Sequence, residues 1–207
     1  SMTDEIRILL EQSKIPTVLI GGGKDKEAFD TVSIDNYHGA FIATEYLIKK
    51  KALKKIAHIT GPKENDDAFL RKKGFIDACK KNGITINRSF IVEGDYSRDS
   101  GYHGFLKLLG SSSKPEAIFA ANDMMALGCY DAANYLNISI PADIALVGFD
   151  DIFVSQYLNP PLTTVRVQIE EVGRTAANIL VNKLNGSNGK VFPLVKIPTA
   201  LIIRGSC

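Results

Sequence analysis

The 207-residue sequence lacks several features by which other classes of protein are recognised. It has no run of about 20 apolar residues that could cross a membrane. Its first residues, SMTDEIRILLEQ, lack the basic and apolar regions of a secretory signal. The formal net charge is only +2, so overall electrostatics give no sign of a nucleic-acid or membrane surface. We therefore expect a cytoplasmic protein without a membrane partner.

The three cysteines are few and widely spaced: Cys79, Cys129 and Cys207. They form no CxxC pair, and no histidine accompanies them at the spacing that binds zinc. An odd number of scattered cysteines favours free thiols and hence a reducing compartment. The sequence predicts no metal site and no cofactor.

Enzyme signatures are also missing. The chain contains no GxSxG, no HExxH and no dinucleotide fingerprint, and its glycine run GGGKDKEA fits no phosphate-binding motif, which predicts a plain turn. The paired carboxylates at 66–67 and 150–151 have the chemistry of an acid and a base, but nothing arranges them with a nucleophile. We interpret three histidines at unrelated positions as structural, and we expect no enzymatic activity: His38, His58 and His103.

What the sequence does contain is an alternation of strands and helices. From residue 56 onward, apolar runs of strand length are separated by helical patterns at nearly even spacing, which indicates an α/β fold with a parallel sheet covered on both faces. The expected strands lie near 56–60, 90–93, 116–121 and 144–149, and the expected helices near 68–82, 98–110 and 123–136. Outside this region we expect helices near 6–13, 35–48 and 168–184, and short strands at 17–20, 31–34 and within 191–203, with turns at 21–23 and 185–190.

Helical periodicity also predicts which side chains are buried. On the helix near 68–82 these are Phe75, Ile76 and Cys79. On the next helix they are Tyr102, Phe105, Leu106 and Leu109, and on the late helix they include Ile169, Val172 and Ala176. The dense lysine run from Lys49 to Lys55 is interpreted as a solvated helix end, because lysines near a helix carboxyl terminus complement its dipole.

Two strand-to-helix junctions place polar side chains at one edge of the expected sheet. The apolar run 117–121 ends at Asn122-Asp123, and the run 144–149 ends at Asp150-Asp151. Because the carboxyl ends of parallel strands share an edge, Asn122 and Asp150 are expected to face one crevice, where ligands usually bind. Helix capping or turn formation would explain the same residue types, and the two roles are compatible.

Three motifs in register resemble one known family. AANDMMALG at 120–128, PADIALVGFDD at 141–151 and PPLTTV at 160–165 resemble the effector-binding domain of the lactose/galactose repressor family, which is built like the periplasmic sugar-binding proteins. The resemblance implies a two-lobed α/β fold of the periplasmic-binding-protein type. It implies a carboxyl-terminal lobe made of 35–165 and 196–207, and an incomplete amino-terminal lobe made of 1–34 and 169–190. The DNA-binding head of whole family members is expected to be absent from this sequence.

The resemblance also implies a ligand site. It matches Arg71, Asn122, Asp150 and Tyr96 to effector-contacting positions, and it places Asn65 and Asp67 at two more. Carboxylate, amide and guanidinium groups suit a polyhydroxylated sugar, and an aromatic face suits its ring. Arg71 and Asp150 are also expected to neutralise one another. The acidic and amide groups disfavour an anionic, purine-like ligand.

Simpler interpretations exist for these positions. Without the resemblance, Arg71 would be read as a solvated helix arginine and Tyr96 as loop packing, and the loop at 61–67 as a solvated acidic turn. Gly21 stands where some sugar-responsive relatives carry an aspartate, so one hydroxyl contact is expected to be missing.

The function implied by the resemblance is effector sensing in a bacterial transcription regulator of the repressor class, with no enzymatic step. We expect a small molecule, namely a sugar, to bind between the lobes and to alter operator binding by the absent helix-turn-helix domain. Paired heads imply a homodimer, with Leu127 and Leu158 toward the partner, although both fit equally well as core leucines. The alternative is a periplasmic-type sugar receptor for transport, which shares this architecture.

Overall fold

The computed structural model describes residues 4–13, 15–21, 28–186 and 194–207. It confirms the expected α/β class, and the chain forms two compact units. The large unit comprises Asn36–Val167 and Thr199–Cys207, and the small unit comprises Ser1–Asp35 and Gln168–Pro198. Among the described residues, no helix is both long and apolar enough to cross a membrane.

A six-stranded sheet forms the centre of the large unit. Its strand order is β4-β3-β5-β6-β7-β9, and all neighbouring strands are parallel except β7 and β9. The central strands are short, mainly apolar and buried on both faces, as in parallel sheets generally. The strands are β3 (Ile56–Thr60), β4 (Ile91–Glu93), β5 (Ala117–Ala120), β6 (Ala145–Asp150), β7 (Thr163–Val167) and β9 (Thr199–Ile202).

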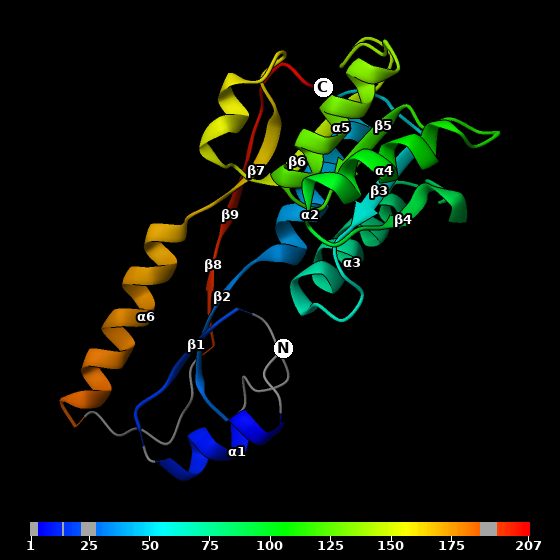
Figure 1. The fold of residues 1–207 in the computed structure, drawn as a ribbon. Coiled ribbons are helices and arrows are strands. Elements are labelled where there is room, and N and C mark those ends of the chain that lie inside the picture. The colour runs from blue at the N-terminus through cyan, green and yellow to red at the C-terminus, as the bar shows by residue number, and fades with distance from the viewer. Residues whose placement is uncertain (1–3, 14, 22–27, 187–193) are drawn as a thin grey trace. The chain divides into compact units, whose positions relative to one another are not determined.

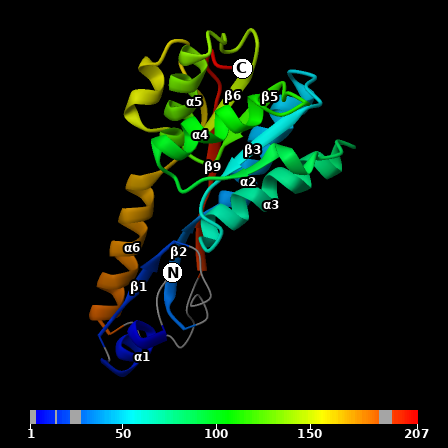
Figure 2. The same cartoon turned by 45° about the vertical axis from the view of Figure 1, so that its right-hand side comes forward.

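Two pairs of helices cover this sheet (Figures 1 and 2). One pair is α2 (Asn36–Lys49) with α3 (Asp66–Lys81), and the other is α4 (Arg98–Leu109) with α5 (Asp123–Tyr135). Two short 3-10 helices, η2 (Arg88–Phe90) and η3 (Phe153–Tyr157), precede β4 and follow β6. The elements predicted between residues 56 and 149 are therefore all present, with bounds that differ by at most two residues.

The predicted core of the large unit is largely correct. Phe75, Cys79 and Phe105 are fully buried, and the partly buried residues Tyr102, Leu106 and Leu109 pack against the core. Ile76 was predicted to be buried but is 36% exposed. The buried side of α3 instead follows Ala68, Arg71, Gly74, Phe75, Ala78 and Cys79, and Ile76 lies beside this stripe.

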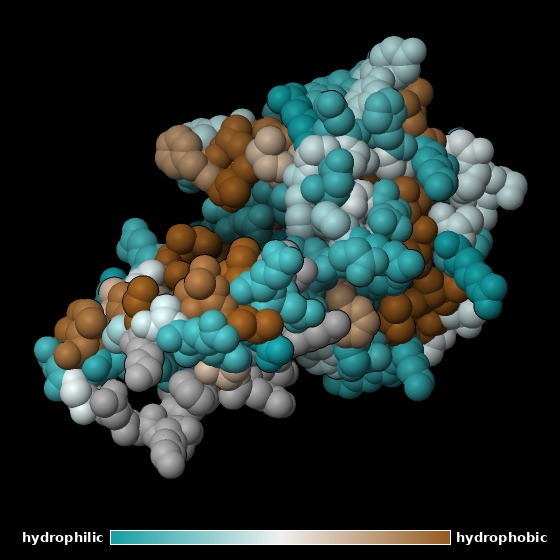
Figure 3. Space-filling model, turned by 60° about the horizontal axis from the view of Figure 1, so that its bottom comes forward, coloured by the Kyte–Doolittle hydropathy of each residue, from teal (hydrophilic) through white to brown (hydrophobic). Residues whose placement is uncertain are grey.

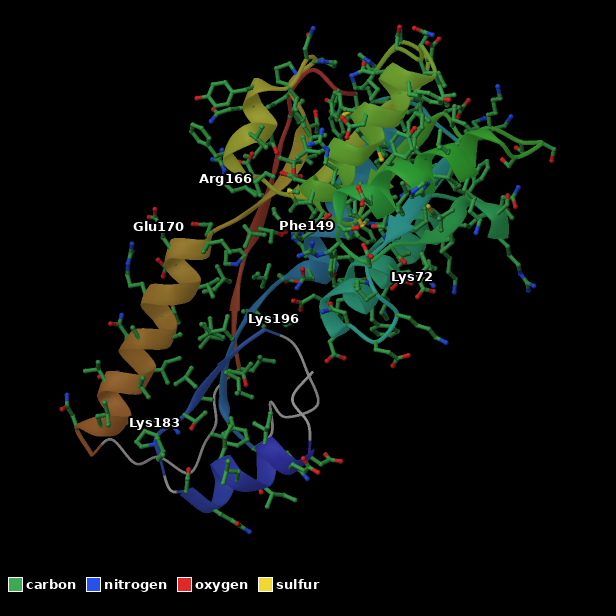
Figure 4. The ribbon with its side chains drawn as sticks, viewed as in Figure 1. Lys72, Phe149, Arg166, Glu170, Lys183 and Lys196 are labelled. Atoms are coloured by element: carbon green, nitrogen blue, oxygen red, sulfur yellow. The ribbon has the colours of Figure 1, made fainter. Side chains whose placement is uncertain are left out.

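The small unit has a three-stranded parallel sheet of order β1-β2-β8, with β1 (Val18–Ile20), β2 (Asp30–Ile34) and β8 (Leu194–Ile197). Helices α1 (Asp4–Ser13) and α6 (Ile169–Leu184) belong to it. Among its described residues, one buried core cluster consists of Val32, Val172, Ala176 and Ile197. The buried carboxylate of Asp30 is neutralised by Lys183 of α6, which is marked in Figure 4.

Many apolar side chains of the small unit remain on its surface. Figure 3 shows hydrophobic residues gathered over this unit. Ile169, which was predicted to be buried, is 65% exposed. The inner stripe of α6 begins one turn later, at Val172. The other exposed apolar residues include Ile6, Leu9, Ile15, Ile20, Val181, Leu184 and Leu194.

The predicted turns at 21–23 and 185–190 lie mostly outside the described residues.

Helices α4 and α5 approach closely because glycine occurs on both. A Cβ atom added to Gly101 would lie 2.0 Å from the carbonyl oxygen of Met125, and one added to Gly128 would lie 1.9 Å from that of Arg98. Neither backbone can move without displacing a helix. This contact fixes the start of α5, which carries one wall of the site described below.

We predict that Gly128→Ala lowers the free energy of unfolding by about 3 kcal/mol or more, because the new methyl group overlaps a backbone carbonyl in a packed interface. Gly173→Ala is the matched control. It also lies inside a helix, but a Cβ atom there meets nothing within 4 Å, so alanine should stabilise the protein by about 0.5–1 kcal/mol through its helix propensity. Differential scanning calorimetry of both variants tests this, and equal effects would contradict the close approach of the two helices.

Candidate ligand-binding site

The candidate site lies at the carboxyl edge of the large sheet, where β3, β5 and β6 end. Asn122 follows β5 and caps α5, because its Oδ1 accepts a hydrogen bond from the backbone N–H of Met125 at 2.9 Å. The same side chain uses its amide group to donate to the carbonyl oxygen of Tyr96 at 3.1 Å. Capping therefore uses one end of this amide, and the other end joins the start of α5 to the loop after β4.

Arg71 lies at the centre of the site, on the buried side of α3. It is only 6% exposed, which excludes the interpretation as a solvated helix arginine. Its Nε donates to Oδ1 of Asn36 at 2.7 Å, and its Nη1 donates to the carbonyl oxygen of Ala121 at 2.6 Å. Nη1 also lies 3.2 Å from Oδ1 of Asp150. The Arg71–Asp150 ion pair expected from the sequence is present, and Nη2 is left without a hydrogen bond to a described residue.

Two aromatic rings frame this guanidinium. Its central carbon lies 3.8 Å from the ring centroid of Phe149 and 5.7 Å from that of Tyr96. Figure 4 marks Phe149 at the end of β6. An aromatic face attracts a cation through its quadrupole, and it does so more strongly in a desolvated position. The two rings therefore stabilise the buried charge and also fix its plane.

Tyr96 is held in an unusual conformation. Its backbone φ is 71°, in the left-handed region that is uncommon for a side chain of this size. Its hydroxyl donates to Oδ1 of Asn65 at 3.3 Å, and burial raises the pKa of this hydroxyl to about 12. Asn65 is the N-cap of α3 and accepts from the N–H of Ala68 at 2.9 Å. Tyr96 thus contacts Arg71 and Asn65 and does more than fill a loop.

Two carboxylates complete the site. Asp150 is about a third exposed, with 34% of its side chain accessible. Burial raises its pKa above the ordinary value, and the charge of Arg71 opposes this effect. Asp67, in the first turn of α3, has a buried Oδ1 without a hydrogen-bond partner among the described residues. Its negative charge acts on both Tyr96 and Asp150.

A third carboxylate lies behind the site. Asp123, next to Asn122, is fully buried. It accepts hydrogen bonds from the hydroxyls of Ser155 and Thr164, both at 2.6 Å, and from the N–H of Ile152 at 3.0 Å. Burial is the main cause that raises its pKa to about 6. This residue joins α5 to β7 and to the segment after β6.

The structure thus brings together all six residues expected from the sequence within one unit: Arg71, Asn122, Asp150, Tyr96, Asn65 and Asp67. Sequence reasoning missed Asn36 and Phe149. A partial signal existed for both, since each lies at an end of a helix or strand, but no pattern indicated contact with Arg71. Among the described residues, no cluster of histidine, cysteine or acidic side chains could hold a metal ion.

His58 is structural, but one of its two ring nitrogens has no hydrogen-bond partner among the described residues. His58 is fully buried and stacks between Phe75 and Phe119, as expected of a structural residue. Its Nδ1 lies 2.8 Å from the carbonyl oxygen of Phe119, but its Nε2 has no partner among the described residues. Burial lowers its pKa to about 4, so the ring stays neutral.

The chain matches the family described as periplasmic binding protein-like domains over residues 44–207. It is 37% identical over 183 residues to the HTH-type transcriptional repressor PurR of Proteus mirabilis, covering 87% of this chain and 53% of that protein. The chain therefore spans about half the length of this curated relative.

Solved structures show the same similarity. A putative transcriptional regulator LacI from Bacillus cereus superposes with a TM-score of 0.92 at 33% identity, over 100% of this chain and 73% of that one. The complex of the transcriptional regulator CelR with cellobiose superposes with a TM-score of 0.91 at 29% identity, over 99% and 62% of the two chains.

We predict that Arg71→Met destabilises the large unit at pH 7, because methionine fills the space beside Phe149 but leaves Asp150 without its cation. Breaking a buried pair typically costs about 3–5 kcal/mol. About 2 kcal/mol is expected here, since a third of Asp150 is exposed. Arg98→Met is the control, because it removes a bidentate but solvent-exposed pair with Asp131 and should change stability little. Urea denaturation measures both, and equal losses would contradict a buried pair.

A second prediction concerns pH. Because the folded protein raises the pKa of Asp123 from 3.8 to about 6, the native state holds a proton between these values that the unfolded chain has released. Stability from this group is therefore present below about pH 4 and is lost as the pH rises toward 6. Relative to Asp123→Asn, the wild type should lose roughly 3 kcal/mol between pH 4 and pH 7. Urea denaturation across this range measures the difference, and a constant difference would show that Asp123 does not titrate there.

Proposed function

Because the chain belongs to the family of LacI- and PurR-type transcriptional regulators, through its periplasmic binding protein-like domain, we propose that it senses a small-molecule effector for such a regulator, most simply a repressor. The chain has no enzymatic role in this proposal, in agreement with relatives that are regulators. The effector would bind at Arg71, Asn122 and Asp150. Operator DNA would be contacted by another part of the regulator.

The observation that carries the proposal is the cluster of unused hydrogen-bonding groups around Arg71. Among the described residues, Nη2 of Arg71 donates no hydrogen bond, and the buried Oδ1 of Asp67 accepts none. The second oxygen of Asp150 likewise has no partner within the described part of the chain. A buried polar atom without a partner is costly, so a ligand that supplies donors and acceptors relieves that cost.

A sugar is the ligand class that fits these groups best. Arg71 and Asp150 neutralise one another, which leaves the negative charge of Asp67 uncompensated within the site. An anion would therefore meet two carboxylates, whereas a neutral hydroxyl can donate to Asp67 or Asp150 and accept from Arg71. Tyr96 offers an aromatic face for a sugar ring. The CelR structure, which contains cellobiose, supports the same class.

We further propose that the two units are two lobes of a hinged receptor, with one lobe made of 35–165 and 196–207 and the other including 1–34 and 169–190. A ligand shifts such an equilibrium only if its affinity differs between the two arrangements. The chain passes between the units at three points, after Asp35, Val167 and Pro198. Ligand-driven bending at these crossings would alter operator binding.

Homodimerisation is also part of the proposal. Leu158 packs partly against the core of the large unit, as the simpler interpretation had it, and Leu127 is half-buried. The neighbouring side chains of η3 support a partner surface better, since Phe153 is 77% and Tyr157 is 66% exposed. Such a regulator would act in the cytoplasm, where Cys79, Cys129 and Cys207 stay reduced; all three are free thiols. No specific observation favours a transport receptor over a regulator.

We predict that cellobiose, ribose or a related neutral sugar raises the melting temperature of the protein in a thermal-shift screen, as expected when a ligand binds only the native state. Asp150→Asn and Asn122→Ala should abolish this stabilisation. Asp131→Asn is the control, because Asp131 forms an exposed ion pair outside the site, and it should respond like the wild type.

The screen also includes nucleosides, sugar phosphates and amino acids. Stabilisation by one of these classes alone would contradict the sugar assignment while leaving the sensing role. If no compound stabilises the wild type, the sensing proposal itself is contradicted. Stabilisation that persists in Asp150→Asn would place the ligand elsewhere on the protein.

A further inference from the structure

We propose that Asp151 is a positioning residue for the candidate site: through Arg166 and Arg204 it holds the turn that directs the carboxylate of Asp150 toward Arg71 and a bound ligand. The part that concerns the ligand rests on the proposed function. The part that concerns the Arg71–Asp150 pair does not, and it can be tested without a ligand.

The backbone of this turn is the first observation. Asp150 has a φ of 111° and Asp151 a φ of 56°, so two consecutive residues other than glycine occupy the left-handed region. L-residues avoid this region because the Cβ atom approaches the neighbouring carbonyl group. Such conformations persist only where surrounding contacts hold them. The contacts of both aspartates therefore have to maintain the turn.

The contacts of Asp151 are the second observation. Its side chain is only 7% exposed. Oδ2 accepts from Nε of Arg166 at 2.6 Å, and Oδ1 accepts from Nη2 of Arg204 at 2.7 Å. Hydrogen bonds between charged groups are short and strong compared with neutral ones. Each oxygen of one carboxylate is thus fixed by a different arginine, and Figure 4 marks Arg166 on β7.

The two aspartates are held by different partners. Asp150 is paired with Arg71 on α3, whereas Asp151 is paired with arginines on β7 and after β9. Adjacent carboxylates repel one another when they share a poorly solvated space. Because each carboxylate has its own cation, this repulsion is weakened. Removing the arginine partners of Asp151 would therefore change the electrostatic environment of Asp150. The geometry therefore points to Asp151 as an indirect determinant of where the carboxylate of Asp150 lies.

The two arginines differ in what else they bind. Arg204 also donates to the carbonyl oxygen of Leu162 and, through its backbone N–H, to the hydroxyl of Thr163, both at 2.8 Å. Replacing Arg204 would therefore also disturb the position of β7. Arg166 is half-exposed, with 51% of its side chain accessible, and the one hydrogen bond that its side chain makes among the described residues goes to Asp151. Arg166→Gln is therefore the milder variant, which loosens Asp151 while Arg204 still neutralises it.

The test measures the environment of Arg71, which Asp151 does not contact. In protein labelled with ¹⁵N-arginine, the Nε–H of Arg71 is identified by its loss in Arg71→Lys. Its exchange with solvent should be slow, because it is buried and bonded to Asn36. We expect about tenfold faster exchange in Asp151→Asn, and a smaller increase in Arg166→Gln, because local opening exposes it. Backbone amides of β5 serve as the reference for global unfolding.

Asp131→Asn is the matched control. It breaks a bidentate arginine pair of the same chemistry, with Arg98, outside the site, and it should leave the exchange of Arg71 unchanged. If Asp151→Asn accelerates the reference amides and Arg71 equally, Asp151 is merely structural and the inference is overturned. If Asp151→Asn does not fold, Arg166→Gln decides: unchanged exchange of Arg71 there would equally overturn the inference.

The ligand part is tested by isothermal titration with cellobiose. If the wild type binds cellobiose, Asp151→Asn and Arg166→Gln should each bind it about tenfold more weakly. Affinities equal to that of the wild type would refute a role of Asp151 in ligand binding. If neither cellobiose nor any other sugar binds the wild type, the sugar assignment of the proposed function fails instead. In that case the exchange of Arg71 still decides whether Asp151 positions Asp150.

Discussion

One buried cation determines the arrangement of the candidate site. Removing the guanidinium of Arg71 from water is costly unless hydrogen bonds, an opposite charge and polarisable groups replace the solvent. These replacements come from the start of α2, from the residue after β5 and from the end of β6. Each of these segments must therefore keep its position for α3 to bury its arginine. The helix, the sheet edge and the site are maintained by the same contacts.

Parallel topology explains why so many polar groups meet at this edge. Every strand that ends there is followed by a loop and a helix start, and each helix start needs an acceptor for its free N–H groups. Asn65 and Asn122 supply these acceptors for α3 and α5 through Oδ1. Asn65 also accepts from Tyr96, and the amide of Asn122 also donates to the loop that carries Tyr96. Capping and site formation are thus two functions of the same side chains.

Much of this arrangement could be predicted from the sequence, because strand-length apolar runs and helical periodicity depend only on neighbouring residues. The burial of Arg71 agrees with the same periodicity, although the sequence pattern alone was interpreted as a solvated helix arginine. Arg71 precedes Phe75 by four residues, and Ala68 precedes Arg71 by three, so the arginine lies on the buried stripe of the helix. Ile76 follows Phe75 directly and therefore lies about 100° around the helix from it. The predictions for Ile76 and Ile169 were wrong because an apolar residue beside a stripe looks the same in sequence as one within it.

The contacts between distant segments could not be predicted in this way. Asn36 reaches Arg71 across 35 residues, and Arg204 reaches Asp151 across 53. Both depend on how helices and strands pack, and no local pattern encodes that. The left-handed backbones of Tyr96, Asp150 and Asp151 are also hidden, because no glycine marks them. Only the resemblance to a known family indicated that Tyr96 and Asp150 belong to one site.

The contacts of the protein itself hold the candidate site, and this affects what the proposed ligand binding would require. The ion pair and its hydrogen bonds use Nε and Nη1 of Arg71 and one oxygen of Asp150, which leaves Nη2 and the second carboxylate oxygen available. A ligand with adjacent hydroxyls can accept from Nη2 and donate to Asp150 without breaking the pair. Little ordering of side chains is then needed, so less of the interaction energy is lost on binding. In the proposed function, the pair that stabilises the folded protein would therefore also be part of the binding surface.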